Sequence, residues 1–220
     1  MMKTAITFLK CNQGFFKTID LINASSTDYI HVDVIDGLFA ANKTFIDQKM
    51  FQYLKESPKP KDVHLMTLHL KKYIDVYSNL NPFSITYQFE ATTNHQETIN
   101  YIKSKNCKVG IAISPLTDLE ELIPYLNQID LVLVMTIIPG YGGQKCIPET
   151  KERVEKLDQI RKEKKYTYLI SVDGGINDKT IAYFKNAQLD IAVSGTYIVN
   201  SESFDRQIES LKKNQSGTFS

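Results

Sequence analysis

Cysteine is scarce in this sequence. Only Cys11, Cys107 and Cys146 occur among its 220 residues, and no Cys-x-x-Cys spacing is present. Such an odd and widely spaced set does not fit a disulfide framework or a dithiol redox motif. It favours reduced thiols, as in proteins of a reducing compartment, and predicts a cytoplasmic location.

An excess of charge of one sign is also missing, and so is any long hydrophobic run. The formal net charge is +1 and the sequence pI is about 7.6, which gives no electrostatic footprint for nucleic acid or an anionic membrane. The longest uncharged apolar stretch, residues 131–140, is far too short to span a bilayer. The first ten residues lack the apolar core and cleavage site of a secretory signal. We therefore expect neither a nucleic-acid partner nor a membrane partner.

What the sequence does have is a regular alternation of β-rich runs with amphipathic stretches. The hydrophobic share of 42% is enough for a sizeable core. Eight such runs lie at residues 5–9, 29–35, 62–66, 84–89, 108–113, 131–136, 168–172 and 191–194. Eight strand–helix units in this length predict an α/β protein, a single (β/α)8 TIM barrel over residues 1–213 with a polar tail at 214–220. The alternative is a doubly wound open sheet, although no Gly-x-Gly-x-x-Gly follows the first strand.

Three connecting stretches carry helix signals. Residues 117–126 have apolar side chains at steps of three and four, and Thr117 with Glu120 fits a capping box. Residues 148–164 begin acidic and end basic, which suits the helix dipole. Asn177 and Asp178 stand where the N-cap of a further helical segment is expected.

The ends of three predicted strands carry residues that could bind a metal. His31 and Asp33 share one face of the second strand, His64 ends the third, and Asp173 ends the seventh. Because the strand ends of a barrel meet at one face, these side chains can converge. Two imidazole nitrogens and two carboxylates form a plausible site for Zn, Mn, Fe or Co. Each residue alone has a simpler explanation as a hydrogen-bonded core or turn residue, so the prediction depends on their convergence.

Three successive strand–helix turns contain glycine, after the sixth, seventh and eighth strands. They include residues 140–143, Gly174–Gly175 and Gly195–Thr196. Glycine lets backbone N–H groups approach an anion, and barrel phosphate sites commonly lie after strands seven and eight. We therefore predict a phosphate site without any lysine or arginine inside these turns. Elsewhere, Asp36 and Gly37 are expected to form a turn, and His69 and His95 to lie on helix surfaces.

At these residues the chain resembles the ribulose-phosphate 3-epimerase family, from residue 6 to about residue 199. The resemblance rests on the order and spacing of residues 31–37, 62–66, 134–136 with 139–144, and 172–177. It implies a barrel of the ribulose-phosphate-binding type that interconverts D-ribulose 5-phosphate and D-xylulose 5-phosphate in the pentose phosphate pathway. It also implies one divalent metal, a sugar phosphate as the small-molecule partner, and a homo-oligomer.

The resemblance further implies roles for individual residues. The metal ligands are expected at His31, Asp33, His64 and Asp173, with Asp33 and Asp173 also acting as acid and base. Substrate contacts are expected at Thr7, His64, Met66, Met135, Gly140, Tyr141, Gly142, Gly143, Gly174, Gly175, Gly195 and Thr196.

Several positions depart from the family pattern. Thr7 stands where the family has serine, Ile35 where it has methionine, Gln88 where it has histidine, and Ile138 where it has asparagine. Ala40 and Ala41 replace the usual Val-Pro. The four metal positions are intact, so the reaction type is expected to persist while the preferred sugar is open. The alternatives are allulose-6-phosphate 3-epimerase, another phosphate-binding barrel enzyme such as a decarboxylase or lyase, and a non-catalytic sugar-phosphate-binding barrel.

Overall fold

Eight parallel strands close into a barrel. The computed structural model describes residues 1–139 and 144–216. Each strand pairs with the next in chain order, and β8 pairs with β1, so the predicted TIM barrel is confirmed and the open sheet is excluded. The strands are β1 Lys3–Thr7, β2 Tyr29–Ile35, β3 Lys61–Met66, β4 Ser84–Gln88, β5 Lys108–Ile113, β6 Leu131–Met135, β7 Leu169–Asp173 and β8 Ile191–Ser194.

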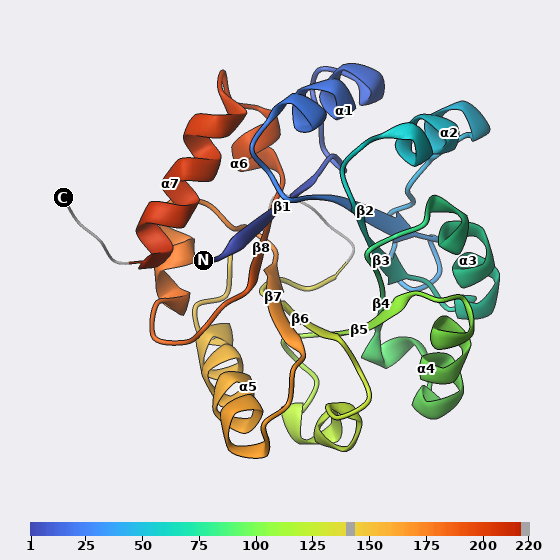
Figure 1. The fold of residues 1–220 in the computed structure, drawn as a ribbon, viewed down its shortest axis with the longest axis vertical. Helices are drawn as coiled ribbons and strands as arrows, with labels where there is room; N and C mark the ends of the chain where they lie inside the picture. Colours follow the sequence, from blue (N-terminus) through green and yellow to red (C-terminus); the bar gives the residue numbers. More distant parts are fainter. Residues whose placement is uncertain (140–143, 217–220) are drawn as a thin grey trace.

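Helices surround the ring of strands, as Figure 1 shows. The α-helices are α1 Phe15–Ala24, α2 Gln48–Glu56, α3 Leu70–Tyr77, α4 His95–Ser104, α5 Thr150–Lys164, α6 Thr196–Val199 and α7 Phe204–Ser216. Short 3-10 helices are η1 Ser78–Leu80, η2 Phe89–Ala91, η3 Leu119–Glu121, η4 Ile123–Tyr125 and η5 Thr180–Phe184. Helix α7 runs three residues into the segment predicted as a polar tail. Within the described ranges, none of the helices has the length and apolar character needed to cross a membrane.

Alternation along the strands divides the apolar core into two parts. Side chains such as Val32, Leu65 and Ile85 belong to the larger cluster, which also contains the buried faces of the helices. The smaller cluster is formed by strand residues of the opposite parity, among them Leu133 and Val193. Strands β2, β3 and β4 contribute few residues to this second cluster, because at the corresponding positions they carry buried polar side chains. Buried polar side chains of the barrel interior therefore come mainly from these three strands.

The segment predicted as a helix at 117–126 is instead two short 3-10 helices, η3 and η4. Pro124 lies in the first turn of η4, where it lacks the N–H that a continuous α-helix would need. The predicted capping box is also wrong. Asp118 accepts the hydrogen bond from the Glu120 N–H, while Thr117 donates its hydroxyl proton to Glu90. Local capping therefore comes from Asp118, while Thr117 pairs with the segment after β4.

The strand boundaries differ slightly from the sequence prediction. Strand β1 begins at Lys3, two residues earlier than expected, because Lys3 pairs with Ile191 of β8. Asn177 was expected at a helix N-cap, and it accepts hydrogen bonds from the N–H groups of Lys179 and Thr180. These bonds form a turn just before the 3-10 helix η5, whose N-cap residue is Lys179 and has no side-chain capping bond.

Candidate active site

The structure brings the four predicted metal ligands together at the ends of β2, β3 and β7. One ligand atom from each of His31, Asp33, His64 and Asp173 lies within 4.8 Å of the others. Asp33 Oδ1 is 3.4 Å from His31 Nε2 and 3.3 Å from His64 Nδ1, and Asp173 Oδ2 is 3.8 Å from both nitrogens. Both imidazoles are fully buried. We call these four residues the carboxylate–histidine cluster.

The atoms of this cluster fit a divalent metal. His31 Nε2 is buried and has no hydrogen-bond partner within residues 1–139 and 144–216, although it is aimed at both carboxylates. An unpartnered buried nitrogen is costly unless something binds it. Two nitrogens and two carboxylate oxygens form a donor set suited to Zn, Mn, Fe or Co. The cluster could therefore hold one metal ion.

The two carboxyl groups of the cluster differ in acidity. Burial and the neighbouring carboxylate of Asp33 raise the pKa of Asp173 to about 6. Burial acts in the same direction on Asp33, but the imidazoles of His31 and His64 outweigh it and hold the pKa of that carboxyl well below its usual range. For His31, burial is likewise outweighed by the carboxylates of Asp33 and Asp62, so its pKa is raised. One carboxyl is thus kept ionised while the other can carry a proton near neutral pH.

Three residues that the sequence did not assign lie directly behind the histidines. Asp62 Oδ2 is 2.8 Å from His31 Nδ1, and Ser84 donates to the other Asp62 oxygen over 2.7 Å. Gln88 Nε2 is 2.9 Å from His64 Nε2. The period-two pattern places Asp62 on the same strand face as His64, which was the available signal. The pairing partner could not be read locally, because it depends on the register that sets His31 beside Asp62.

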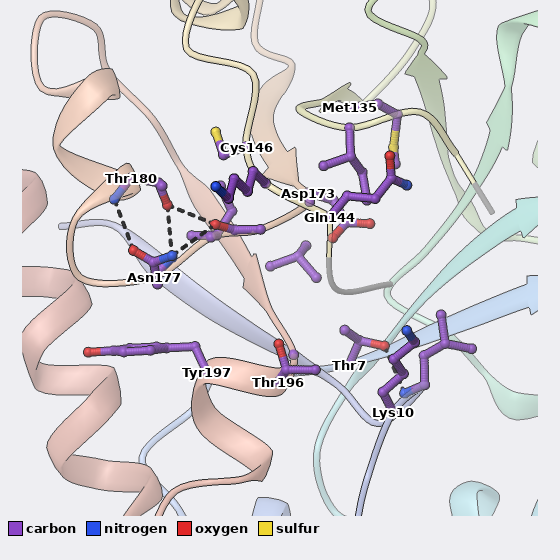
Figure 2. A pocket seen from close by; sticks show the side chains of 18 of the residues that line it. Thr7, Lys10, Met135, Gln144, Cys146, Asp173, Asn177, Thr180, Thr196 and Tyr197 are labelled. Atoms are coloured by element: carbon purple, nitrogen blue, oxygen red, sulfur yellow. Dashed lines mark hydrogen bonds between the residues drawn. The ribbon is translucent and has the colours of Figure 1, made fainter. Parts of the chain in front are cut away.

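A cavity of about 560 Å³ opens onto the cluster. Figure 2 shows Thr7, Met135, Asp173 and Thr196 around it. Of the predicted catalytic and substrate-binding residues, those that line it are Thr7, Asp33, Met66, Met135, Asp173, Gly174, Gly175, Gly195 and Thr196. His64 is fully buried and does not border the cavity. Gly140, Tyr141, Gly142 and Gly143 lie outside the described residues.

Thr7 contacts a member of the cluster. Its hydroxyl donates to Asp33 Oδ2 over 2.5 Å and accepts a hydrogen bond from the Leu9 N–H at 3.3 Å. Its methyl group faces Gly195, where an added Cβ would lie 2.8 Å from Thr7 Cγ2. The hydroxyl expected to touch substrate therefore also holds the Asp33 carboxylate.

The turns at Gly174–Gly175 and Gly195–Thr196, which we call the glycine turns, line the cavity through tightly packed backbone. Gly174 has φ 123° and Gly175 has φ 63°, values that disfavour any residue with a Cβ. A Cβ on Gly174 would lie 2.5 Å from Ile137 Cγ1. Thr180 and Asn177 donate to the Gly175 carbonyl at 2.9 and 3.2 Å, and these bonds hold the first turn (Figure 2).

Among the other residues that border the cavity are two lysines and two tyrosines to which the sequence analysis gave no role. Lys10 follows β1, Lys145 precedes α5, Tyr183 lies on η5 and Tyr197 on α6. Both lysines come from segments that neighbour the glycine turns. Their proximity depends on how the loops fold over the barrel mouth, which has no local sequence signal.

The prediction of a turn at Asp36 is confirmed, whereas the prediction of an exposed His95 is wrong. Asp36 accepts hydrogen bonds from the N–H groups of Leu38 and Phe39, so it forms the expected turn. It also binds Thr67 and Leu68 in the loop after β3. His95 was expected on a helix surface, but it is buried and stacks on Phe89 with ring centroids 4.0 Å apart. That contact joins η2 to α4, which the helical pattern alone could not reveal.

Comparisons with known proteins agree with this arrangement. The sequence model described as the ribulose-phosphate 3-epimerase family matches residues 7–199. A ribulose-phosphate 3-epimerase of Helicobacter pylori is 33% identical over 193 residues, covering 88% of this chain and 89% of that protein. One from Buchnera aphidicola is 38% identical over 192 residues, covering 86% and 84%. Among solved structures, KGPDC from Streptococcus mutans has a TM-score of 0.71 at 12% identity, covering 100% of both chains, a likeness of fold.

Proposed function

Because the chain belongs to the ribulose-phosphate 3-epimerase family, we propose that it interconverts D-ribulose 5-phosphate and D-xylulose 5-phosphate by inverting carbon 3. The observation that carries this proposal is the pair of carboxyl groups, Asp33 and Asp173, at one end of the cavity. Inversion beside a carbonyl requires one group to remove the C3 proton and another to return a proton from the opposite face. Two carboxyl groups on strands β2 and β7 can stand on the two sides of a bound sugar.

The opposite acidities of the pair suit this chemistry. Asp33 is held ionised, so its carboxylate can accept the C3 proton as the C3–H bond breaks. The electron pair is left on an enediolate, and Asp173, with a pKa raised to about 6, can deliver a proton to the other face of C3. The reverse reaction exchanges the two roles. The Thr7 hydroxyl, hydrogen-bonded to Asp33 Oδ2, fixes the orientation of that carboxylate.

His31, Asp33, His64 and Asp173 would hold one divalent metal. When bound, such an ion supplies Lewis acidity toward the oxygens on which negative charge develops. Ile35, Met66 and Met135 border the same end of the cavity with apolar side chains, which exclude water and strengthen electrostatic interactions there.

The glycine turns are proposed to bind the phosphate. Backbone N–H groups in tight glycine turns, one of which leads into helix α6 at Thr196, can approach an anion closely. Phosphate binding would orient the reacting carbon, since binding energy from a remote group can be used at the reaction centre.

The experiment is a comparison of two sugars by NMR and calorimetry with metal-loaded protein. We expect conversion of D-ribulose 5-phosphate to D-xylulose 5-phosphate at a higher kcat/KM than the conversion of D-allulose 6-phosphate. A reversed ratio would replace the pentulose by the hexulose and leave the mechanism in place. Calorimetric binding of both sugars without turnover of either would contradict an enzymatic role and favour a sugar-phosphate sensor.

A further inference from the structure

The two histidines of the cluster present opposite ring nitrogens to its centre. His31 points Nε2 inward and His64 points Nδ1 inward. The orientation of each ring follows from the residue that binds its outer nitrogen. Asp62 holds His31 Nδ1, and Gln88 holds His64 Nε2. These partners differ chemically, because a carboxylate only accepts hydrogen bonds whereas an amide can either donate or accept.

For His31, the partner of the outer nitrogen allows only one position of the ring proton. The Asp62 carboxylate accepts, so His31 Nδ1 carries a proton, and Ser84 donates to the second Asp62 oxygen and fixes the carboxylate. Because the proton stays on Nδ1, Nε2 is the nitrogen available to a metal. This arrangement is the carboxylate–histidine pairing commonly found behind metal ligands.

For His64, the partner of the outer nitrogen places the ring proton on the inward nitrogen instead. Gln88 presents its amide nitrogen, which can only donate, so His64 Nε2 must accept. The ring proton of His64 then lies on Nδ1, where it faces Asp33 Oδ1 at 3.3 Å. A nitrogen that carries this proton has no lone pair to offer a metal. The Gln88 carbonyl oxygen, meanwhile, is buried without a hydrogen-bond partner in the described part of the chain.

We propose that Gln88 is a positioning residue that switches the tautomer of His64 when a metal enters. The amide turns over about its terminal bond, so that Oε1 replaces Nε2 opposite the ring. His64 loses the proton from Nδ1 to solvent and gains one from solvent on Nε2, which then donates to Gln88 Oε1. The ring stays neutral and the proton count is unchanged. An amide keeps nearly the same shape when turned over, so the change needs little repacking.

This inference rests on the proposed metal site but not on the proposed reaction. It makes the two ligands unequal: the His31 Nδ1 proton stays in place in both states, whereas the His64 proton moves from one nitrogen to the other. Gln88 and His64 are both fully buried.

The test uses full-length protein labelled with ¹⁵N-histidine, observed by NMR before and after addition of Zn²⁺. In the metal-free protein we expect His64 to show a protonated Nδ1 and an unprotonated Nε2. With Zn²⁺ we expect Nε2 to be protonated and Nδ1 to be ligated. His31 Nδ1 should remain protonated throughout and serves as the internal reference. A His64 that already carries its proton on Nε2 before Zn²⁺ is added would overturn the switch.

Two variants sharpen the test. Gln88→Glu can only accept while it is ionised, so His64 Nε2 should be protonated with and without Zn²⁺. Gln88→Met has similar volume and no strong hydrogen-bonding group, and its Zn²⁺ affinity should fall about 10–100-fold. The control is Gln52→Met on the exposed side of α2, which should leave affinity unchanged. Unchanged affinity in Gln88→Met would contradict the positioning role, and absence of Zn²⁺ binding by the wild type would overturn the metal site itself.

Discussion

The carboxylate–histidine cluster presents side chains to the cavity, whereas the glycine turns present backbone. In the cluster, His31, Asp33 and His64 are buried and Asp173 is partly buried, at positions where parallel strands normally place apolar residues. In the glycine turns, the absence of a side chain matters, because a Cβ would overlap neighbouring atoms. The cluster thus depends on the chemical groups of its side chains, and the glycine turns depend on the lack of room for a side chain. We therefore expect substitutions in the cluster to lower turnover, and substitutions in the glycine turns to disturb packing and substrate fit.

The largest effect is expected from removing either carboxylate of the cluster. Asp33→Asn and Asp173→Asn should each lower kcat by about 10²–10⁴-fold or more, because each removes an acid–base group and a charged metal ligand. Steady-state kinetics will measure the loss, and metal analysis will report whether the ion is retained. Circular dichroism should show an intact fold. Turnover close to that of the wild type in either variant would contradict the assignment of two bases.

The second prediction concerns metal and pH. The folded-state pKa of Asp173, about 6, lies above its ordinary 3.8, so the stability contribution of this group is present below about pH 4 and is lost as pH rises through 6. The raised pKa of His31 acts in the same direction. A metal ion competes with the protons on Asp173 and His31, so it binds more tightly as the pH rises and these protons are lost.

The increase in Tm caused by Zn²⁺ should therefore grow between pH 5 and pH 7, as thermal melts with and without the ion can measure. Calcium, which prefers oxygen ligands, should give a smaller shift at each pH. A Zn²⁺ increment that is constant or falls with rising pH would show that the cluster is not the binding site.

The third prediction tests the spatial character of the glycine turns. Gly195→Ala would place Cβ 2.8 Å from Thr7 Cγ2, so we expect a loss of about 1–3 kcal/mol in the free energy of unfolding and a raised KM. Thr7→Ser removes that methyl group while keeping the hydroxyl that donates to Asp33. The double variant should recover most of the stability in urea titrations. If Thr7→Ser gives no recovery, the overlap is not the reason for glycine at this position.

The smallest effect is expected at Asp36, which supports the cluster side of the barrel mouth from outside. Burial alone would raise its pKa, but hydrogen bonds from Thr67 and the N–H groups of Phe39, Leu38 and Leu68 lower it to about 2. Its stability contribution is therefore present above about pH 4 and lost as pH falls toward 2.

Asp36→Asn should cost about 1–2 kcal/mol at pH 7, because an amide nitrogen would face two donors. The difference from wild type in urea titrations should shrink at pH 3. A difference that is equal at both pH values would exclude an ionised Asp36 as the anchor of these loops.

The sequence could predict the site residues that belong to local patterns, but not the contacts that depend on strand register or loop folding. The alternation of His31 with Asp33 and the position of Asp173 are local patterns, and the convergence of strand ends in a barrel brings them together. The pairing of Asp62 with His31 follows from the register between β2 and β3, which no local pattern encodes. Similarly, burial of His95 depends on Phe89, and the approach of Lys10 and Lys145 to the cavity depends on loop folding.

The most direct test of the two-base account is isotope exchange at carbon 3 in D₂O. Metal-loaded wild-type protein is incubated with D-ribulose 5-phosphate, and the D-xylulose 5-phosphate formed is examined by NMR. The account predicts deuterium at C3 of the product, because the proton removed by one carboxyl group is replaced from the other, which exchanges with solvent. Product that retains the original C3 proton throughout would contradict inversion by Asp33 and Asp173.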